Sequence, residues 1–480
     1  MEHPSSERQP SYEQLAAENA ELRRQVADLT AQLTVVLERL KVAEAEIAEL
    51  KRRGSGPATP FSKGAGKPDP KKPGRKPGEG PFRRRELPEG AGAGPAIEVP
   101  VESVSCECGG PLEADGFELV STTDIPSIPA PEIRIFKVAC CKCKTCGKRV
   151  RGEHPDVAPD QTGATAHRVG ERGMAIAHLL HYGFGLTVRK VPGVLRMLCG
   201  LKVTQSAITQ HALRQSDRGG VGQAYQGLRL AVRGSPAIFT DDTGWKVGGR
   251  QAWLMGFETA DTRVYQIRPR HRNDEVREVI PGDYDGVMST DRGVSYDAKA
   301  FAAVRQQKCV AHLQRNLSDV LARKHGKAAW FTQYLKRLLA EATDLWWDWR
   351  EGEQDGYEQK AALIRDLVTS HLRDRRLTDQ DNQRLLNELG RHHDRGNLLR
   401  FLDEPGLVEP TNNAAERALR GAVIARKVSQ CSKTEQGAEA HSAFSSVIAT
   451  LHKRRPEDLV EELLKVFREG LVSAKPAATR

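Results

Sequence analysis

Three acidic side chains lie far apart in the sequence and could do chemistry together. Asp241 follows the apolar stretch AIFT, Asp291 follows GVMST, and Glu416 lies in NNAAERALR. Carboxylate oxygens are the ligands that Mg²⁺ prefers, and a two-metal site leaves room for the attacking and leaving oxygens of a phosphodiester. The three residues therefore predict a site for two Mg²⁺ ions, with Mn²⁺ as a substitute and zinc disfavoured.

Each acid also has a simpler explanation. Asp241, its neighbour Asp242 and Asp291 could be turn residues that follow strands. Asn413 and Glu416 have the spacing of a helical capping box. A joint site is favoured by the order of the acids, their strand context and four nearby basic residues. These are Arg417, Arg420, Arg426 and Lys427. Side chains alternate faces along a strand, so only one of Asp241 and Asp242 should face the site.

The length and charge of the chain limit what it can be. A chain of 480 residues is too long to fold around one compact core, so we expect several domains. Its 73 Lys and Arg residues outnumber its 63 Asp and Glu residues, and this positive net charge favours a polyanionic partner. Residues 53–98 form a basic linker rich in Gly and Pro. An apolar run of about 18 residues and a signal peptide are both absent from the sequence. We therefore expect no membrane partner and a cytoplasmic, nucleoid-associated location.

Residues 11–52 carry a seven-residue apolar repeat, which is typical of a coiled coil. One heptad position holds Tyr12, Asn19, Val26, Leu33, Leu40 and Ile47, and another holds Leu15, Leu22, Leu29, Val36, Ala43 and Leu50. Asn19 at a core position favours two strands in one register, so we predict a homodimer. The alternative is an amphipathic helix packed on its own chain, and a repeat longer than three heptads disfavours it.

Six of the nine cysteines lie between Cys106 and Cys146. In a reducing compartment this clustering favours metal over disulfides. Cys143 and Cys146, which are followed by Gly147, have the spacing of a zinc knuckle. Cys106 and Cys108 fit less well, because a single residue separates them where a knuckle has two. We predict a zinc ribbon over residues 99–160 with these four ligands. The alternative is a set of reduced thiols without metal.

Residues 161–234 have a helical pattern that breaks near Gly200 and restarts at Thr204, a predicted N-cap. Two short helices around a turn could form a helix-turn-helix DNA-binding domain or an ordinary helical hairpin. The sequence leaves both interpretations open.

The segment 235–315 changes to a β pattern. AIFTDDT, QAWLMGFET and RVYQIRP predict three antiparallel strands, with Asp241 ending the first, and YDGVMSTD predicts a fourth that ends at Asp291. Both carboxylates would then meet at one edge of a mixed sheet. AFAAVRQQ is a helix candidate. Residues 316–404 predict a helical insertion, 405–430 the second part of the core, and 431–480 C-terminal helices.

Cys309 and His312 have Cys-x-x-His spacing just before the insertion. Two residues cannot complete a zinc site. His312 could orient a phosphate or a ligating carboxylate, or it could simply pack on a helix.

Several motifs together resemble the transposases of insertion-sequence family 66. They are the heptad repeat, GRKPG, CGGPL, CKCKTCG, DDTGWKV, STDRG, QKCVAHLQR and NNAAERALRGAVIARK. The resemblance implies an α/β RNase H-like catalytic core with an all-α insertion, preceded by the coiled coil, the zinc ribbon and the helical domain. It implies metal binding by Asp241, Asp291 and Glu416, and Asp242 occupies the place of the usual Glu of the family.

The expected function is cleavage and strand transfer at transposon ends, with the ends and the target DNA as substrates and companion element-encoded proteins as further partners. Two alternatives stay open at this point. One is a zinc-containing DNA-binding regulator without catalysis, and the other is an RNase H-like structure-selective nuclease. Either would leave part of the motif set without a role.

Overall fold

The computed structural model describes residues 98–101, 105–113, 130–158, 160–373, 375–429 and 431–473, with scattered positions between 21 and 40. The chain divides into two compact units. The cysteine unit comprises Lys63–Ala177 and Val188–Gln210. The core unit comprises Met1–Ser62, His178–Thr187 and His211–Arg480.

Most of the predicted coiled coil and all of the predicted linker before Glu98 lie outside the described residues. The apolar positions of the repeat that are described are helical and exposed. They are Leu22, Val26, Leu29, Leu33 and Leu40. Pairing of two such helices stays a prediction.

The cysteine unit contains a short antiparallel hairpin, in which β1 (Cys140–Lys142) pairs with β2 (Arg149–Arg151). The 3₁₀ turn η1 (Gly163–Thr165), α2 (Glu171–His178), α3 (Val191–Cys199) and α4 (Gln205–Asp217) follow, and α2 and α4 continue into the core unit.

The predicted break between α3 and α4 is confirmed. Gly200 ends α3 with φ 61°, a left-handed conformation that favours glycine. Thr204 Oγ1 accepts a hydrogen bond from the Ala207 N–H at the start of α4, as an N-cap should. Whether these helices act as a helix-turn-helix stays a prediction.

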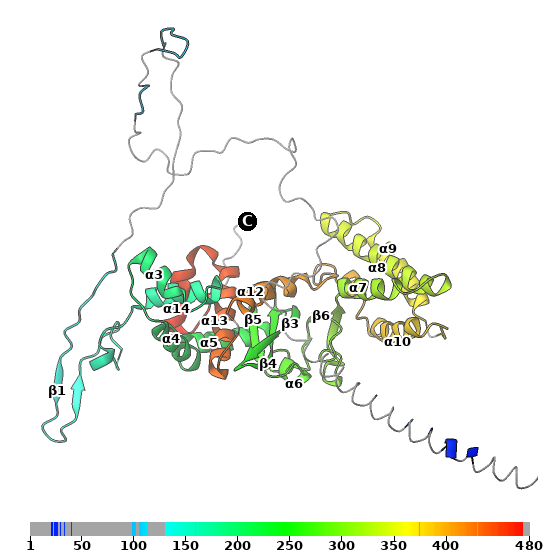
Figure 1. Ribbon diagram of the computed structural model, residues 1–480, viewed down its shortest axis with the longest axis horizontal. Helices are drawn as coiled ribbons and strands as arrows, with labels where there is room; N and C mark the ends of the chain where they lie inside the picture. Colours follow the sequence, from blue (N-terminus) through cyan, green and yellow to red (C-terminus); the bar gives the residue numbers. More distant parts are fainter. Residues whose placement is uncertain are drawn as a thin grey trace, which may run out of the picture. The chain divides into compact units, whose positions relative to one another are not determined.

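The core unit is built on a five-stranded sheet in the order β5-β4-β3-β6-β7 (Figure 1). The strands are β3 (Ala237–Val247), β4 (Arg250–Glu258), β5 (Arg263–Arg268), β6 (Val287–Thr290) and β7 (Arg305–Lys308). The first three are antiparallel, as predicted, and β6 and β7 run parallel to β3. This mixed sheet with its helices is compatible with an RNase H-like core.

Two details of the sheet correct the sequence interpretation. Asp241 lies within β3, because pairing with β4 continues to Val247 and turns at Gly248 and Gly249, whose positive φ values suit a tight hairpin. The expected helix over AFAAVRQQ is wrong. Only the short turn η3 (Lys299–Phe301) forms there, and Arg305 begins strand β7. Polar residues made that strand hard to recognise, although Gln306 and Gln307 are buried.

Helices surround the sheet. In chain order the remaining elements of the core unit are η2 (Leu179–Gly183), α5 (Gly220–Arg233), α6 (Asn273–Arg277), α7 (Val310–Leu321), α8 (Lys327–Glu351), α9 (Tyr357–His371), α10 (Gln380–Asp394), α11 (Arg400–Asp403), α12 (Asn413–Ser429), α13 (Glu435–Arg454), η4 (Pro456–Asp458) and α14 (Leu459–Glu469). The segment predicted as a helical insertion is helical, and its buried side chains form one cluster with Ala237 and Val287 of the sheet. The insertion therefore shares its core with the strands.

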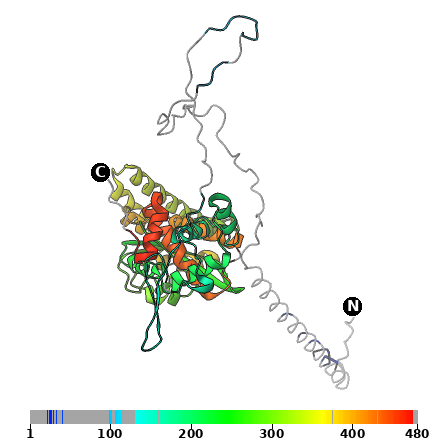
Figure 2. The ribbon, with the colours of Figure 1, turned by 90° about the vertical axis from the view of Figure 1, so that its left-hand side faces the viewer.

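Helix α13, orange to red in Figure 2, covers the edge strand β5. The N–H groups of Arg263, Tyr265 and Ile267 donate to the side-chain hydroxyls of α13 at 3.0, 2.8 and 3.2 Å. The acceptors are Thr450, Ser446 and Ser442, which are spaced by one helical turn. The hydroxyls of α13 thus accept hydrogen bonds from the backbone N–H groups of β5. These groups would otherwise be open to pairing with a further strand.

None of the described helices combines the length and hydropathy that crossing a membrane requires.

Candidate active site

Parallel pairing brings Asp241 and Asp291 together. Phe239 of β3 lies opposite Ser289 of β6, and the pairing ends there. Asp241 and Asp291 each lie two residues beyond this last pair, and the negative charge of Asp291 contributes to the raised pKa of Asp241. Asp291 follows the last residue of β6 and accepts a hydrogen bond on Oδ1 from the Gly293 N–H at 2.8 Å.

Helix α12 lies over the face of the sheet toward which Asp241 points. Asp241 is directly opposite Gly256 of β4, and a Cβ at Gly256 would lie 3.0 Å from Leu419 of α12. Opposite residues of an antiparallel pair share a face. The Tyr265 hydroxyl also donates to the Ala418 carbonyl at 2.6 Å. Glu416 lies one turn before Leu419 on α12, so it is on the same side of the sheet as Asp241.

The start of α12 is fixed to the sheet by Asn412. Its Nδ2 donates to the Thr240 carbonyl at 2.8 Å, and its backbone N–H donates to Cys309 Sγ at 3.2 Å. Asn412 and Cys309 are both fully buried. Cys309 therefore supports the backbone beside Glu416.

The capping-box explanation of Glu416 is not supported. Helix α12 begins at Asn413, so Asn412 precedes the helix and Glu416 is its fourth residue. In a capping box the Glu would be the third residue. Glu416 instead faces α7, where His312 Nδ1 lies 4.0 Å and Arg315 Nη2 3.8 Å from Glu416 Oε1.

The neighbouring acids raise the proton affinity of Asp241. Burial, followed by the negative charges of Asp242, Asp291 and Glu416, raises the pKa of Asp241 to about 7, although a hydrogen bond from the Asp242 N–H opposes the shift. Negative charges close to a partly buried carboxylate disfavour its ionisation. A nearby cation would relieve that repulsion.

Asp242 faces the other side of the sheet. Its Oδ1 lies 3.1 Å from His271 Nδ1. Burial and the charge of Asp291 raise the pKa of Asp242 to about 7, whereas burial lowers the pKa of His271. Tyr296, which is fully buried, lies on this side too, 5.6 Å from the His271 ring. Of the two adjacent aspartates, Asp241 is therefore the one directed toward α12.

The basic residues after Glu416 divide into two groups. Arg426 Nη1 donates to Thr243 Oγ1 at 2.9 Å and to the Gly244 carbonyl at 2.6 Å, so it anchors α12 on β3. Arg417, Arg420 and Lys427 are exposed on α12. Only the exposed residues are free to meet a polyanion.

The carboxylates suit a divalent cation by ligand type, charge and mutual repulsion. Among the described residues, however, no group of three or more His, Cys, Asp or Glu side chains is close enough to hold a metal ion. Binding would require Asp241, Asp291 and Glu416 to draw closer together.

The four predicted zinc ligands lie in two turns of the cysteine unit. The Gly109 N–H donates to the Cys106 carbonyl at 2.8 Å, and the Gly147 N–H donates to the Cys143 carbonyl at 3.0 Å. Hydrogen bonds from Cys108 lower the pKa of the Cys106 thiol. Those from Cys146 and Thr145 lower the pKa of Cys143 to about 7. Thiolates are the zinc-binding form, but the described part of the chain does not gather both pairs into one group.

Several residues at the site gave no signal in the sequence. Asn412 contacts the Thr240 carbonyl next to Asp241, His271 contacts Asp242, and Lys308 contacts the Asp291 carbonyl, each across a long stretch of chain. Lys308 directly follows the pair Gln306 and Gln307, which also carried no apolar pattern. Such contacts depend on the packing of the fold, which local periodicity does not encode.

One family comparison covers this part of the chain. A model described as "Transposase IS66 family" matches residues 167–440, which is more than half of the 480 residues and includes all three acids. No curated protein matches the chain. Transposases cleave DNA and transfer strands, which agrees with an acidic site beside exposed basic residues. The chain belongs to the IS66 transposase family.

Proposed function

We propose that the chain cuts and joins DNA at the ends of its insertion sequence, using Asp241, Asp291 and Glu416 to hold divalent metal. The observation that carries this proposal is the convergence of β3, the end of β6 and the start of α12 on one group of carboxylates. The family match supports the transposase activity, and the metal-dependent chemistry goes beyond it.

The proposed reaction has two steps. Water attacks a phosphodiester at the element end, the new phosphorus–oxygen bond forms, and the bond to the 3′ oxygen breaks to leave a 3′-hydroxyl. That hydroxyl then attacks a target phosphodiester and releases a target 3′-hydroxyl. Bound Mg²⁺ would supply charge stabilisation and activation of the attacking oxygen.

The residues of the chain have separate roles in this proposal. Asp241 and Asp291 would hold the metal from the sheet, and Glu416 would hold it from α12. His312 and Arg315 keep Glu416 oriented from α7. The exposed basic residues of α12, Arg417, Arg420 and Lys427, contact the DNA backbone, which is a salt-sensitive interaction.

The N-terminal segments are proposed to assemble the complex. Exposed apolar positions of the heptad repeat suit pairing with a second copy. Zinc held by Cys106, Cys108, Cys143 and Cys146 would fix the cysteine unit. A dimer that carries two DNA-binding modules gains from effective concentration when it brings two ends together.

An in vitro reaction tests the proposal. The full-length protein is mixed with labelled duplexes of the element ends, a supercoiled plasmid and Mg²⁺. The proposed function predicts cleavage at the end and joining of the 3′-hydroxyl to the plasmid. Cleavage without joining would indicate a nuclease, and binding without cleavage would indicate a regulator. Either result would contradict the proposal.

A further inference from the structure

The helical insertion contacts the loop of Asp291 at two side-chain pairs, one of them an ion pair. Arg292 Nη1 lies 2.6 Å from Glu388 Oε1, and Asp297 Oδ2 lies 3.6 Å from His392 Nε2. Glu388 and His392 are four residues apart on α10 and so share a helix face. That face therefore reaches both ends of the segment 292–297 directly after Asp291.

Lys308 links the same loop to the backbone of Asp291. Its side chain is completely buried at the end of β7, and its Nζ lies 2.7 Å from Asp297 Oδ1. The same ammonium donates to Thr290 Oγ1 at 3.2 Å and to the Asp291 carbonyl at 3.3 Å. All three N–H donors of Lys308 thus have acceptors, as a buried ammonium requires.

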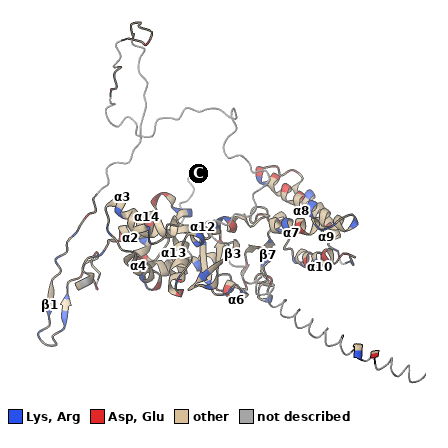
Figure 3. Ribbon diagram, viewed as in Figure 1, with Lys and Arg blue, Asp and Glu red and all other residues tan. Residues whose placement is uncertain are grey.

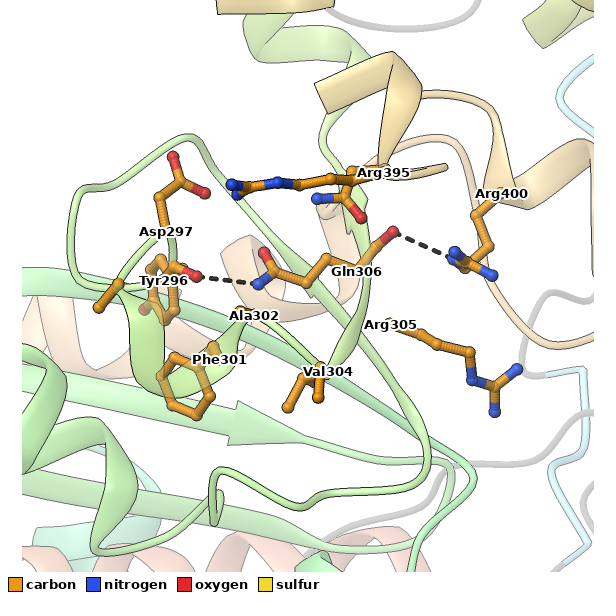
Figure 4. A pocket seen from close by; sticks show the side chains of 12 residues that line it. Tyr296, Asp297, Phe301, Ala302, Val304, Arg305, Gln306, Arg395 and Arg400 are labelled. Carbon is orange, nitrogen blue, oxygen red and sulfur yellow. Dashed lines mark hydrogen bonds between the residues drawn. The ribbon is translucent and has the colours of Figure 1, made fainter. Parts of the chain in front are cut away.

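The chain that follows α10 is bonded to the edge of β7. The Lys308 N–H donates to the Asn397 carbonyl at 2.7 Å, and Gln307 Nε2 donates to the Leu398 carbonyl at 3.1 Å. Figure 4 shows the small pocket at this junction, about 100 Å³, where Gln306 donates to the Tyr296 carbonyl and accepts from Arg400 on its own carbonyl. Helix α10 is therefore held against both the loop and the sheet.

The pairing between α10 and the loop is specific. Both signs of charge are mixed along the insertion helices (Figure 3), so a general attraction between oppositely charged faces does not explain the contact. At the other end of α10, Asp379 and Asp381 pair with Lys324 at 2.7 and 2.8 Å. The contacts of Glu388 and His392 are the ones directed at the loop.

We propose that Glu388 and His392 are positioning residues for the reaction: α10 holds Asp291 in place through Arg292, Asp297 and Lys308. The insertion is thereby coupled to the chemistry, because any shift of α10 changes the loop that sets the Asp291 backbone. The inference rests on the proposed catalytic role of Asp291.

A charge exchange in the full-length protein tests the Arg292–Glu388 contact. Glu388→Gln should lower kcat for Mg²⁺-dependent nicking about 10- to 100-fold, since small displacements of a reacting group cost this much. KM for end DNA should change less than about twofold, because the contact does not bind substrate. The double variant Arg292→Glu with Glu388→Arg should recover most of kcat. Glu341→Gln is the matched control, because its pair with Arg337, at 3.1 Å, stays within α8.

Amide hydrogen exchange gives a second readout that does not need activity. Glu388→Gln should speed exchange over residues 292–297, and Glu341→Gln should not. Unchanged kcat and unchanged exchange in Glu388→Gln would overturn the inference, as would a loss that the charge exchange fails to restore. If the wild-type protein does not nick DNA, the proposed function fails instead, and the exchange rates still decide whether α10 holds the loop.

Discussion

At the scale of residues, the site depends on side chains that hold the acids as much as on the acids themselves. Asn412 joins the start of α12 to the Thr240 carbonyl beside Asp241, and Cys309 accepts the Asn412 N–H. The family resemblance identified Asp241, Asp291 and Glu416 as candidate metal ligands. No local sequence pattern, however, distinguishes Asn412 from the adjacent Asn413. The difference arises because one lies before the helix and is buried, whereas the other is exposed.

That difference can be measured. Asn412→Ala should lower the free energy of unfolding by about 1–3 kcal/mol, since it leaves the buried Thr240 carbonyl without its donor. Asn413→Ala, at the neighbouring exposed position, should change it by less than about 0.5 kcal/mol. Urea denaturation of both variants makes the comparison. Equal effects would mean that the Asn412 hydrogen bond contributes nothing specific.

At the scale of elements, the strands were more predictable than their surroundings. The hairpins β3 to β5 follow from alternating apolar residues and the turn at Gly248 and Gly249. Strand β7 was missed because its sequence, RQQK, is polar although three of its four side chains are buried. Gln307 and Lys308 bond to partners outside the strand, such as Leu398 and Asp297, which only the fold brings near.

The cover of β5 by α13 leads to a stability prediction. Ser446→Ala should lower the free energy of unfolding by about 1–3 kcal/mol, because the buried Tyr265 N–H loses its acceptor. Ser445→Ala is the matched control, since Ser445 is also buried on α13 but is not among the hydroxyls that bond β5. Similar losses in both variants would argue against edge protection by these hydroxyls.

A group of half-buried histidines predicts sensitivity to acid. Burial and the charge of Arg214 lower the pKa of His211 to about 4, and burial lowers that of His441 to about 3. Both are neutral when folded and gain protons on unfolding below about pH 6.5. Their stabilising contribution is complete above that pH and falls toward the folded pKa, by about 1.4 kcal/mol per pH unit for each histidine.

The test is the free energy of unfolding measured from pH 7 to pH 5. His211→Gln should make its dependence on pH shallower, because one proton-uptake site of the unfolded chain is removed. His452→Gln, at an exposed position of α13, should leave the slope as in the wild type. If His211→Gln leaves the pH dependence of the free energy of unfolding unchanged, His211 does not contribute to the acid sensitivity.

At the scale of the whole molecule, the proposed function separates chemistry from assembly. Asp241, Asp291 and Glu416 belong to the core unit, whereas the four predicted zinc ligands belong to the cysteine unit. The sequence predicts an order for these parts from heptads, cysteine pairs and strand patterns, which are local signals. The shared core of the insertion and the sheet could not be predicted, because it joins residues far apart in the chain.

Deletion of residues 1–52 should therefore reduce paired-end assembly more than nicking of a single end. The reason is that the predicted coiled coil would supply effective concentration to the second contact without entering the active site. Native gels of end DNA with two labels measure pairing, and a denaturing gel measures nicking. Equal loss of both would contradict this division.

The most direct measurement of the central claim is Mg²⁺-dependent nicking by Asp241→Asn, Asp291→Asn and Glu416→Gln. These changes keep the size of each side chain and remove the charge that would hold the ion. The proposed function predicts that each variant loses at least about 100-fold in nicking rate while binding end DNA as the wild type does. Near wild-type nicking by any of the three would contradict it and would remove that residue from the active site.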